Sequence, residues 1–165
     1  MNEGLIIAII IGISIASVPL IFAAIGELLV ERSGVLNLGV EGMMIVGALA
    51  GFVVEFHTGS SFLAVLAALL GGMAIASIFA FLTQILLTNH VATGLALTLF
   101  GLGIAAFIGR GYSEENIQLI SAIHIPLLSD FPIVGPLLFS YNPLVYLAFF
   151  MVFLVCWRSE ERRVG

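Results

Sequence analysis

The polar residues of the stretch 27–42 are the side chains of this chain that could do chemistry. Glu27 and Glu31 lie one helical turn apart, and so do Asn37 and Glu41, a spacing that places each pair on one helix face. Carboxylates and amides at such positions can hydrogen-bond the hydroxyl groups of a polar solute. Charged groups in apolar surroundings are costly, so they are usually present for a reason. The stretch 27–42 is therefore the first candidate for a functional site.

Glu41 is the most informative of these residues, because it lies about one turn into an apolar segment. Exposing it to lipid would cost about 2.5–3.5 kcal/mol on insertion scales. Two interpretations stay open: the carboxylate lines a path for a polar solute, or it is structural. In the structural case it caps amides where the backbone breaks around Gly39 and Gly42, or it pairs with Arg32. Asn37 would join either role.

For three further polar residues, Glu27, Asn89 and Thr93, a structural role and a role on the solute path both stay open. Glu27, with Glu31, forms an interfacial charge pair with Arg32, or it lies on the same solute path. Asn89 and Thr93 flank the start of a later apolar run. There Asn89 caps a helix, or both side chains contact the solute.

Enzymes and nucleic-acid-binding proteins are disfavoured by the motifs and the charge of the chain. There is no Walker A motif, so we do not expect this chain to hydrolyse ATP. The 3 histidines have no cysteine or carboxylate at ligand spacing, so no metal site is expected. All 5 basic residues are arginines, too few for a nucleic-acid surface. We expect no catalytic residue and no cofactor.

The composition is that of an integral membrane protein. Of 165 residues, 61% are hydrophobic and only 9% are charged, and the mean hydropathy is +1.24. A soluble domain carries about 25% charged residues. The apolar runs are continuous and do not alternate, which favours helices over barrel strands. The sequence therefore predicts an all-α, polytopic helical membrane protein.

Continuous apolar runs predict about five transmembrane helices. The runs cover residues 5–30, 36–54, 62–87, 91–108 and 143–157. The second run contains Asn37 and Glu41, and we expect a broken helix that hides both from lipid. Gly47 and Gly51 in the same run have the spacing at which another helix can approach closely. The fifth run would form a helix of about 22 Å, shorter than the hydrocarbon core of about 30 Å.

Residues 109–142 differ in composition from the apolar runs, because they are polar at first and then rich in proline and apolar residues. Prolines at positions 126, 132 and 136 preclude a regular helix, and we expect a short segment at the membrane interface between His124 and Pro136. The acidic N-terminus carries no positive side chain, which favours an outside location. Arg32 and His90 would then face the cytoplasm, and residues 109–142 the outside.

Three separated stretches resemble a known family. Glu31-Arg-Ser-Gly-Val-Leu-Asn-Leu-Gly-Val-Glu-Gly-Met-Met44 resembles the signature of bacterial ABC-importer permeases of the branched-chain amino acid/ribose class, nearest to their nucleoside and simple-sugar branch. Thr93-Gly-Leu-Ala-Leu97 and residues 125–139 agree with it. The resemblance implies a multi-pass protein of the bacterial cell (inner) membrane that takes up nucleosides or simple sugars. It implies three partners: an ATP-binding subunit, a second permease subunit and an extracytoplasmic substrate-binding lipoprotein.

The end of the chain departs from that family, which continues with a loop that docks on the ATPase and with further spans. Residues 158–165, Arg-Ser-Glu-Glu-Arg-Arg-Val-Gly, resemble the conceptual translation of a common sequencing adapter. The alternative is a natural basic segment after a span. We expect residues 1–157 to be the N-terminal part of a permease domain and residues 158–165 to be an artefact. A native stop codon after Gly165 in the source gene would contradict this.

Two hypotheses from other classes compete with an ABC permease. A secondary transporter would move its solute without an ATPase, so the ATP dependence of uptake separates the two. A non-transporting membrane scaffold would carry polar residues only at its interfaces, which Asn37 and Glu41 contradict.

Overall fold

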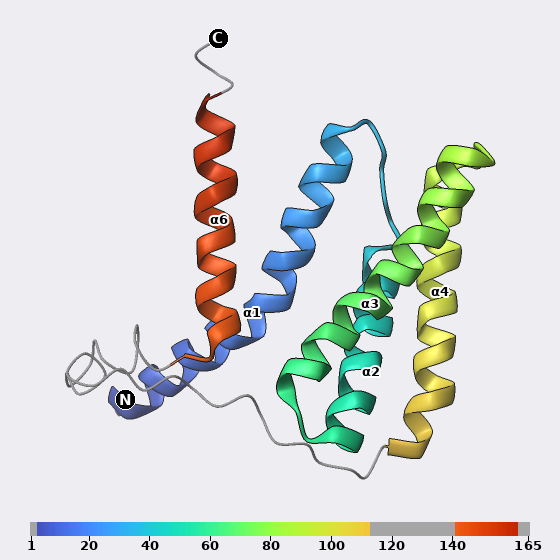
Figure 1. The fold of residues 1–165 in the computed structure, drawn as a ribbon. Coiled ribbons are helices and arrows are strands. Elements are labelled where there is room, and N and C mark those ends of the chain that lie inside the picture. Colours follow the sequence, from blue (N-terminus) through green and yellow to red (C-terminus); the bar gives the residue numbers. More distant parts are fainter. Residues whose placement is uncertain (1–2, 113–140, 162–165) are drawn as a thin grey trace. The chain divides into compact units, whose positions relative to one another are not determined.

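The computed structural model describes residues 3–112 and 141–161, which form helices joined by short connections (Figure 1). The long helices are α1 (Glu3–Arg32), α2 (Val40–Thr58), α3 (Ser61–Ala80), α4 (His90–Gly109) and α6 (Pro143–Glu161). A π-helical segment, η1 (Phe81–Ile85), continues α3, and a 3-10 turn, η2 (Arg110–Tyr112), follows α4. These two ranges contain no strand, and the prediction of an all-α fold is confirmed.

Four of the described helices are long and apolar enough to cross a membrane. They cover Gly4–Arg32, Val40–Thr58, Ser61–Ile85 and His90–Tyr112, and a shorter apolar helix covers Pro143–Arg158. This agrees with about five predicted spans, of which the last is short. Most of the large apolar side chains on these helices are exposed, as expected where lipid surrounds them.

The break predicted within the second helix lies ahead of it instead. The run was expected to be helical from Leu36, but α2 begins at Val40 and is continuous through Gly42. Gly34 has a left-handed φ of 84°, and the Asn37 side chain bonds the backbone of Gly39. Such local side-chain bonds compete with helix formation, which explains why residues 33–39 stay outside the helix.

Two further predictions concern the end of the last helix and the segment that precedes it. The last helix reaches Glu161 rather than stopping at Trp157. The interfacial segment predicted between His124 and Pro136 lies outside the described residues.

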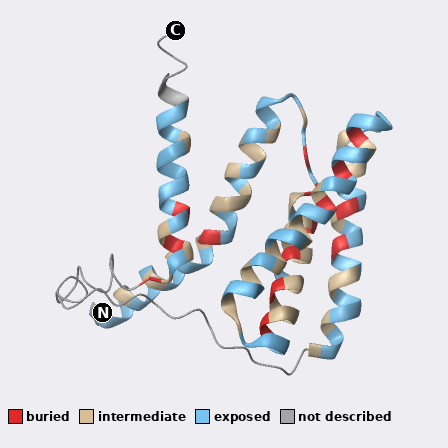
Figure 2. Cartoon of the chain, viewed as in Figure 1, coloured by how far each residue is buried: buried red, intermediate tan, exposed pale blue. Residues whose placement is uncertain are grey.

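The chain divides into two compact units. One holds Met1–Gly26 with Ile120–Gly165, and in it Val18 is buried against residues of the α6 region, namely Tyr141, Val145 and Ala148. The other is Glu27–Leu119, in which α2 packs against both α3 and α4. Figure 2 shows the buried residues of this second unit on all three helices, and its apolar core holds Ile75, Phe79 and Leu97.

The close approach predicted for Gly47 and Gly51 is confirmed between α2 and α3. A Cβ atom at Gly47 would lie 2.9 Å from the carbonyl oxygen of Ala68, and one at Gly51 3.1 Å from that of Ala64. The first distance is shorter than real Cβ atoms adopt, and the second is a tight contact that would require a small backbone shift. The two helices therefore touch backbone to backbone along this face.

Leu87, just after η1, has a φ of 53°, in the left-handed region. This costs a residue with a Cβ atom about 1–2 kcal/mol, and the side chain is 81% exposed, so its removal loses little burial. We expect Leu87→Gly to raise the apparent unfolding temperature of the purified protein by about 2–4 °C. Leu86→Gly, at a φ of −86°, is the matched control and should lower it. Equal shifts for the two variants would contradict the strain at Leu87.

Candidate functional site at the start of α2

Asn37 fixes the connection between α1 and α2. It is only 6% exposed. Its Oδ1 atom accepts a hydrogen bond of 2.9 Å from the Gly39 N–H, and its own N–H donates to Oε1 of Glu27 at 3.0 Å. Its Nδ2 atom lies 3.7 Å from the sulfur of Met43, a weak acceptor. Since Asn37 precedes the helix, the expectation that it shares a helical face with Glu41 was wrong.

Glu27 lies near the end of α1 and reaches the same connection. One carboxylate oxygen holds the backbone of Asn37. The other, Oε2, is buried and has no hydrogen-bond partner among the described residues. The predicted charge pair was an interfacial one, whereas the observed bond fixes a backbone amide ten positions further along the chain.

Glu41 lies in the first turn of α2, where a carboxylate is favoured by the helix dipole. Its side chain is exposed in this structure. The N-cap position of α2 is occupied by Gly39, which has no side chain to form a cap bond.

The start of α2 meets α4 without intervening side chains. A Cβ atom at Gly94 would lie 2.8 Å from the backbone nitrogen of Gly39. One at Gly42 would lie 2.6 Å from the carbonyl oxygen of Leu97, and one at Gly101 2.8 Å from that of Gly42. Two of the three sequence stretches that carried the family resemblance, 31–44 and 93–97, are therefore in direct backbone contact.

Thr98 adds a hydrogen bond to this crossing that the sequence did not reveal. Its hydroxyl donates to the carbonyl oxygen of Leu38 at 3.0 Å. This carbonyl belongs to the non-helical connection, and the Thr98 hydroxyl gives it a hydrogen-bond partner. In the sequence, the only sign of this bond was that Thr98 is a polar residue on an apolar helix, five positions after Thr93.

Asn89 and Thr93 hold the turn before α4. Oδ1 of Asn89 accepts a bond of 3.0 Å from the Ala92 N–H, so the interpretation of Asn89 as a helix cap is confirmed. The Thr93 hydroxyl lies 2.9 Å from that of Thr88, which itself bonds the carbonyl oxygen of Leu82. Both predicted residues therefore have structural partners.

A shallow depression of about 360 Å³ joins this turn to the connection before α2. It is lined by Gly34, Leu36, Thr88, Asn89, His90 and Val91. Asn37, Glu27 and Glu41 are not among its lining residues. The structure thus brings Glu27 and Asn37 together, and Asn89 with Thr93, but it does not bring all five predicted residues into one cavity.

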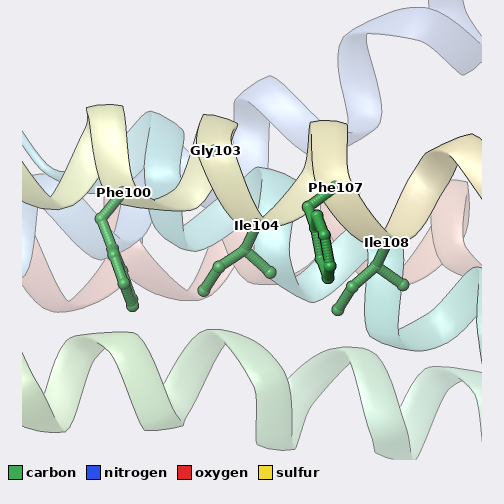
Figure 3. A pocket seen from close by; sticks show the side chains of 5 residues that line it. All are labelled: Phe100, Gly103, Ile104, Phe107 and Ile108. Carbon is green, nitrogen blue, oxygen red and sulfur yellow. The ribbon is translucent and has the colours of Figure 1, made fainter.

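A second hollow, of about 310 Å³, runs along α4 and is wholly apolar. Figure 3 shows Phe100, Ile104, Phe107 and Ile108 extending from the same side of the helix. It offers no hydrogen-bonding group to a polar solute, so it is an apolar contact surface rather than a candidate solute site.

Glu55, in the last turn of α2, was missed as a buried group. It is 9% exposed, its Oε1 atom accepts a bond of 3.1 Å from the Ser61 hydroxyl, and its Oε2 atom is buried without a partner among the described residues. The predicted span ended at Val54, so Glu55 was assigned to a polar turn. The signal that marked Glu41, a carboxylate beside an apolar run, was present here too.

Comparisons with known proteins agree with one another. The chain is 42% identical over 154 residues to a protein of Haloferax volcanii named putative glucose ABC transporter permease protein TsgC13, covering 91% of this chain and 47% of that protein. It is 31% identical to the nucleoside ABC transporter permease protein NupC of Lactococcus lactis, covering 87% and 48%. It is 30% identical to the guanosine ABC transporter permease protein NupQ of Bacillus subtilis, covering 89% and 52%.

The chain spans about half the length of the curated relatives that it matches. No solved structure matches it. Residues 9–165 match the family described as branched-chain amino acid transport system, permease component. With several membrane-spanning helices and this match over nearly all its length, the chain is a multi-pass membrane protein that belongs to the family of branched-chain amino acid transport system permease components.

Proposed function

We propose that this chain is part of the transmembrane permease subunit of an ABC importer that takes up nucleosides or simple sugars, with ATP hydrolysed by a partner. The observation that carries the proposal is the match to the permease family over residues 9–165. The names of its relatives, which refer to glucose, nucleosides and guanosine, support the substrate class.

The local structure of the α2 start supports transport over a scaffold role. Non-helical backbone within a transmembrane region is tolerated where protein buries it or where it lines a cavity, and transporters place such segments at their solute paths. Here residues 33–39 are held by Glu27, Asn37 and Thr98. A connection held by three side chains in this way fits a role in transport.

We assign different roles to the predicted site residues. Glu41 is exposed and makes no hydrogen bond to the described residues, so it is the residue that we place on the translocation path. Glu27 and Asn37 position the connection before α2, and Asn89 and Thr93 position the start of α4. The partners in the proposal are an ATP-binding subunit, a second permease subunit and an extracytoplasmic substrate-binding lipoprotein.

Uptake measured with the full-length gene product tests the function. The permease is expressed together with an ATPase and a binding protein from the same organism, and entry of labelled guanosine, glucose and leucine into cells is followed. We expect saturable uptake of guanosine or glucose that disappears when the partner's ATPase is inactivated and survives a protonophore. In the same assay Glu41→Gln should slow uptake without lowering the unfolding temperature.

The competing hypotheses give different results in this assay. Uptake that persists without an active ATPase and collapses with the protonophore would indicate a secondary transporter. Absence of uptake for all three solutes, with correctly inserted protein, would favour a scaffold. Uptake of leucine alone would retain the ABC permease and reject the substrate class.

A further inference from the structure

Both ends of α2 are held by a carboxylate of which only one oxygen has a hydrogen-bond partner among the described residues. At the start, Oε1 of Glu27 accepts the Asn37 N–H at 3.0 Å. At the end, Oε1 of Glu55 accepts the Ser61 hydroxyl at 3.1 Å. In each case the second oxygen, Oε2, is buried with no hydrogen-bond partner among the described residues, and these are the two side-chain atoms of that kind found there.

The connections before and after α2 also contain the two described glycines that have a left-handed φ. Gly34, in the connection before α2, has a φ of 84°, and Gly59, in the connection after it, has a φ of 62°. Gly59 also donates its N–H to the carbonyl oxygen of Glu55 at 2.7 Å. Each connection therefore combines a glycine with backbone freedom and a carboxylate that restrains it.

A half-satisfied carboxylate is poorly suited to a purely structural role. Burying a carboxylate oxygen without a donor is costly, and the single hydrogen bond to the other oxygen offsets only part of that cost. When the connection opens, the whole carboxylate returns to water or meets a new donor. The closed and open arrangements are thus closer in free energy than they would be with a neutral or fully paired side chain.

We propose that Glu27 and Glu55 are positioning residues of the transport cycle, two carboxylate latches that hold the connections on either side of α2 and release them as the permease changes state. The latches rest on the proposed transport function. Glu27 acts on the backbone N–H of Asn37 and Glu55 on the side-chain hydroxyl of Ser61, and neither needs to touch the solute. The hinge in this scheme is the glycine in each connection.

Substitution by glutamine tests the latches in the full-length protein, assembled with its partners in membranes. Glu27→Gln and Glu55→Gln keep an oxygen that can accept the same hydrogen bond but remove the charge that is costly to bury. We expect each variant to raise the apparent unfolding temperature by about 2–4 °C. Because the closed state is then favoured, the initial rate of solute uptake should fall about threefold or more.

Two further variants keep the test decisive. Ser61→Ala removes the donor to Glu55 and loosens that latch, so it should lower the unfolding temperature while uptake stays at or above that of the wild type. Glu31→Gln removes an exposed carboxylate one turn from Glu27 and should change neither quantity. The order of stability expected at the second latch is Glu55→Gln above wild type above Ser61→Ala.

A merely structural role predicts that stability and uptake move together. If the glutamine variants lower both, or change neither, the latches are rejected. The changes in unfolding temperature test the latches even if no transported solute is identified. Failure of the wild-type protein to take up any solute would reject the proposed function. Equal unfolding temperatures for Glu55→Gln, the wild type and Ser61→Ala would reject the latches alone.

Discussion

Replacing Gly101 with alanine is expected to destabilise the unit around α2 strongly. The new Cβ atom would lie 2.8 Å from the carbonyl oxygen of Gly42 and 2.9 Å from its Cα atom. These are backbone atoms of a helix and cannot move aside as a side chain can. Overpacking of this kind costs about 1–3 kcal/mol, and more where the backbone cannot relax. We expect a fall of several degrees in unfolding temperature and severalfold less folded protein in membranes.

Gly103→Ala is the matched control for this prediction. It lies on the same helix, and a Cβ atom there meets nothing within 4 Å. Alanine is also the better helix former, so the control should be neutral or slightly stabilising. Fluorescence-detected size-exclusion chromatography of tagged variants gives both the yield and the unfolding temperature. Equal behaviour of the two variants would show that α2 and α4 are not in backbone contact.

Gly42, on the α2 side of the same contact with α4, allows a test of whether the two substitutions have additive effects on stability. A Cβ atom at Gly42 would lie 2.6 Å from the carbonyl oxygen of Leu97. Gly42→Ala should therefore be as harmful as Gly101→Ala. Because both strain one contact, the double variant should lose less stability than the sum of the single ones.

Hydropathy was enough to predict the class of fold and most of the spans. A run of some twenty apolar residues has few alternatives to a transmembrane helix, and local signals were read correctly where the partners are near in sequence. The Asn89 cap depends on an amide three residues away. The contact face of Gly47 and Gly51 follows from their spacing on one helix.

The candidate site was less predictable because its contacts join distant residues. Thr98 and Leu38 are separated by 60 positions, and no pattern in one sequence pairs them. Glu27 and Asn37, ten positions apart, were both selected for their polarity, but their bond depends on the turn of the chain at Gly34. Polarity identified the residues, and only the fold identified their partners.

The end of α2 shows how a boundary error hid a functional candidate. The span was ended at Val54, yet the helix continues to Thr58 and is closed by Gly59 in the left-handed conformation. A glycine just after the last helical residue is a common stop signal. Placing the stop there would have put Glu55 inside the helix and marked it, like Glu41, as a carboxylate in apolar surroundings.

Replacing Asn37 with alanine is the second variant for which we expect a large effect. The substitution removes the acceptor for the Gly39 N–H, and both residues are buried. An unpaired buried amide costs about 1–3 kcal/mol. Asn89→Ala is the comparison, since it removes the same kind of bond at an exposed helix cap and should cost about 1 kcal/mol. The unfolding temperature should therefore fall further for Asn37→Ala.

Asn37→Ser distinguishes the lost hydrogen bond from the lost volume. A serine hydroxyl can accept from the N–H two residues later, although more weakly than asparagine does, so it should recover part of the stability. No recovery would mean that the bond to Gly39 is not what Asn37 contributes. The rate of uptake per folded molecule then separates the two interpretations of this residue. A positioning role predicts that stability and rate recover together in the serine variant, whereas direct contact with the solute predicts a restored stability with uptake still impaired.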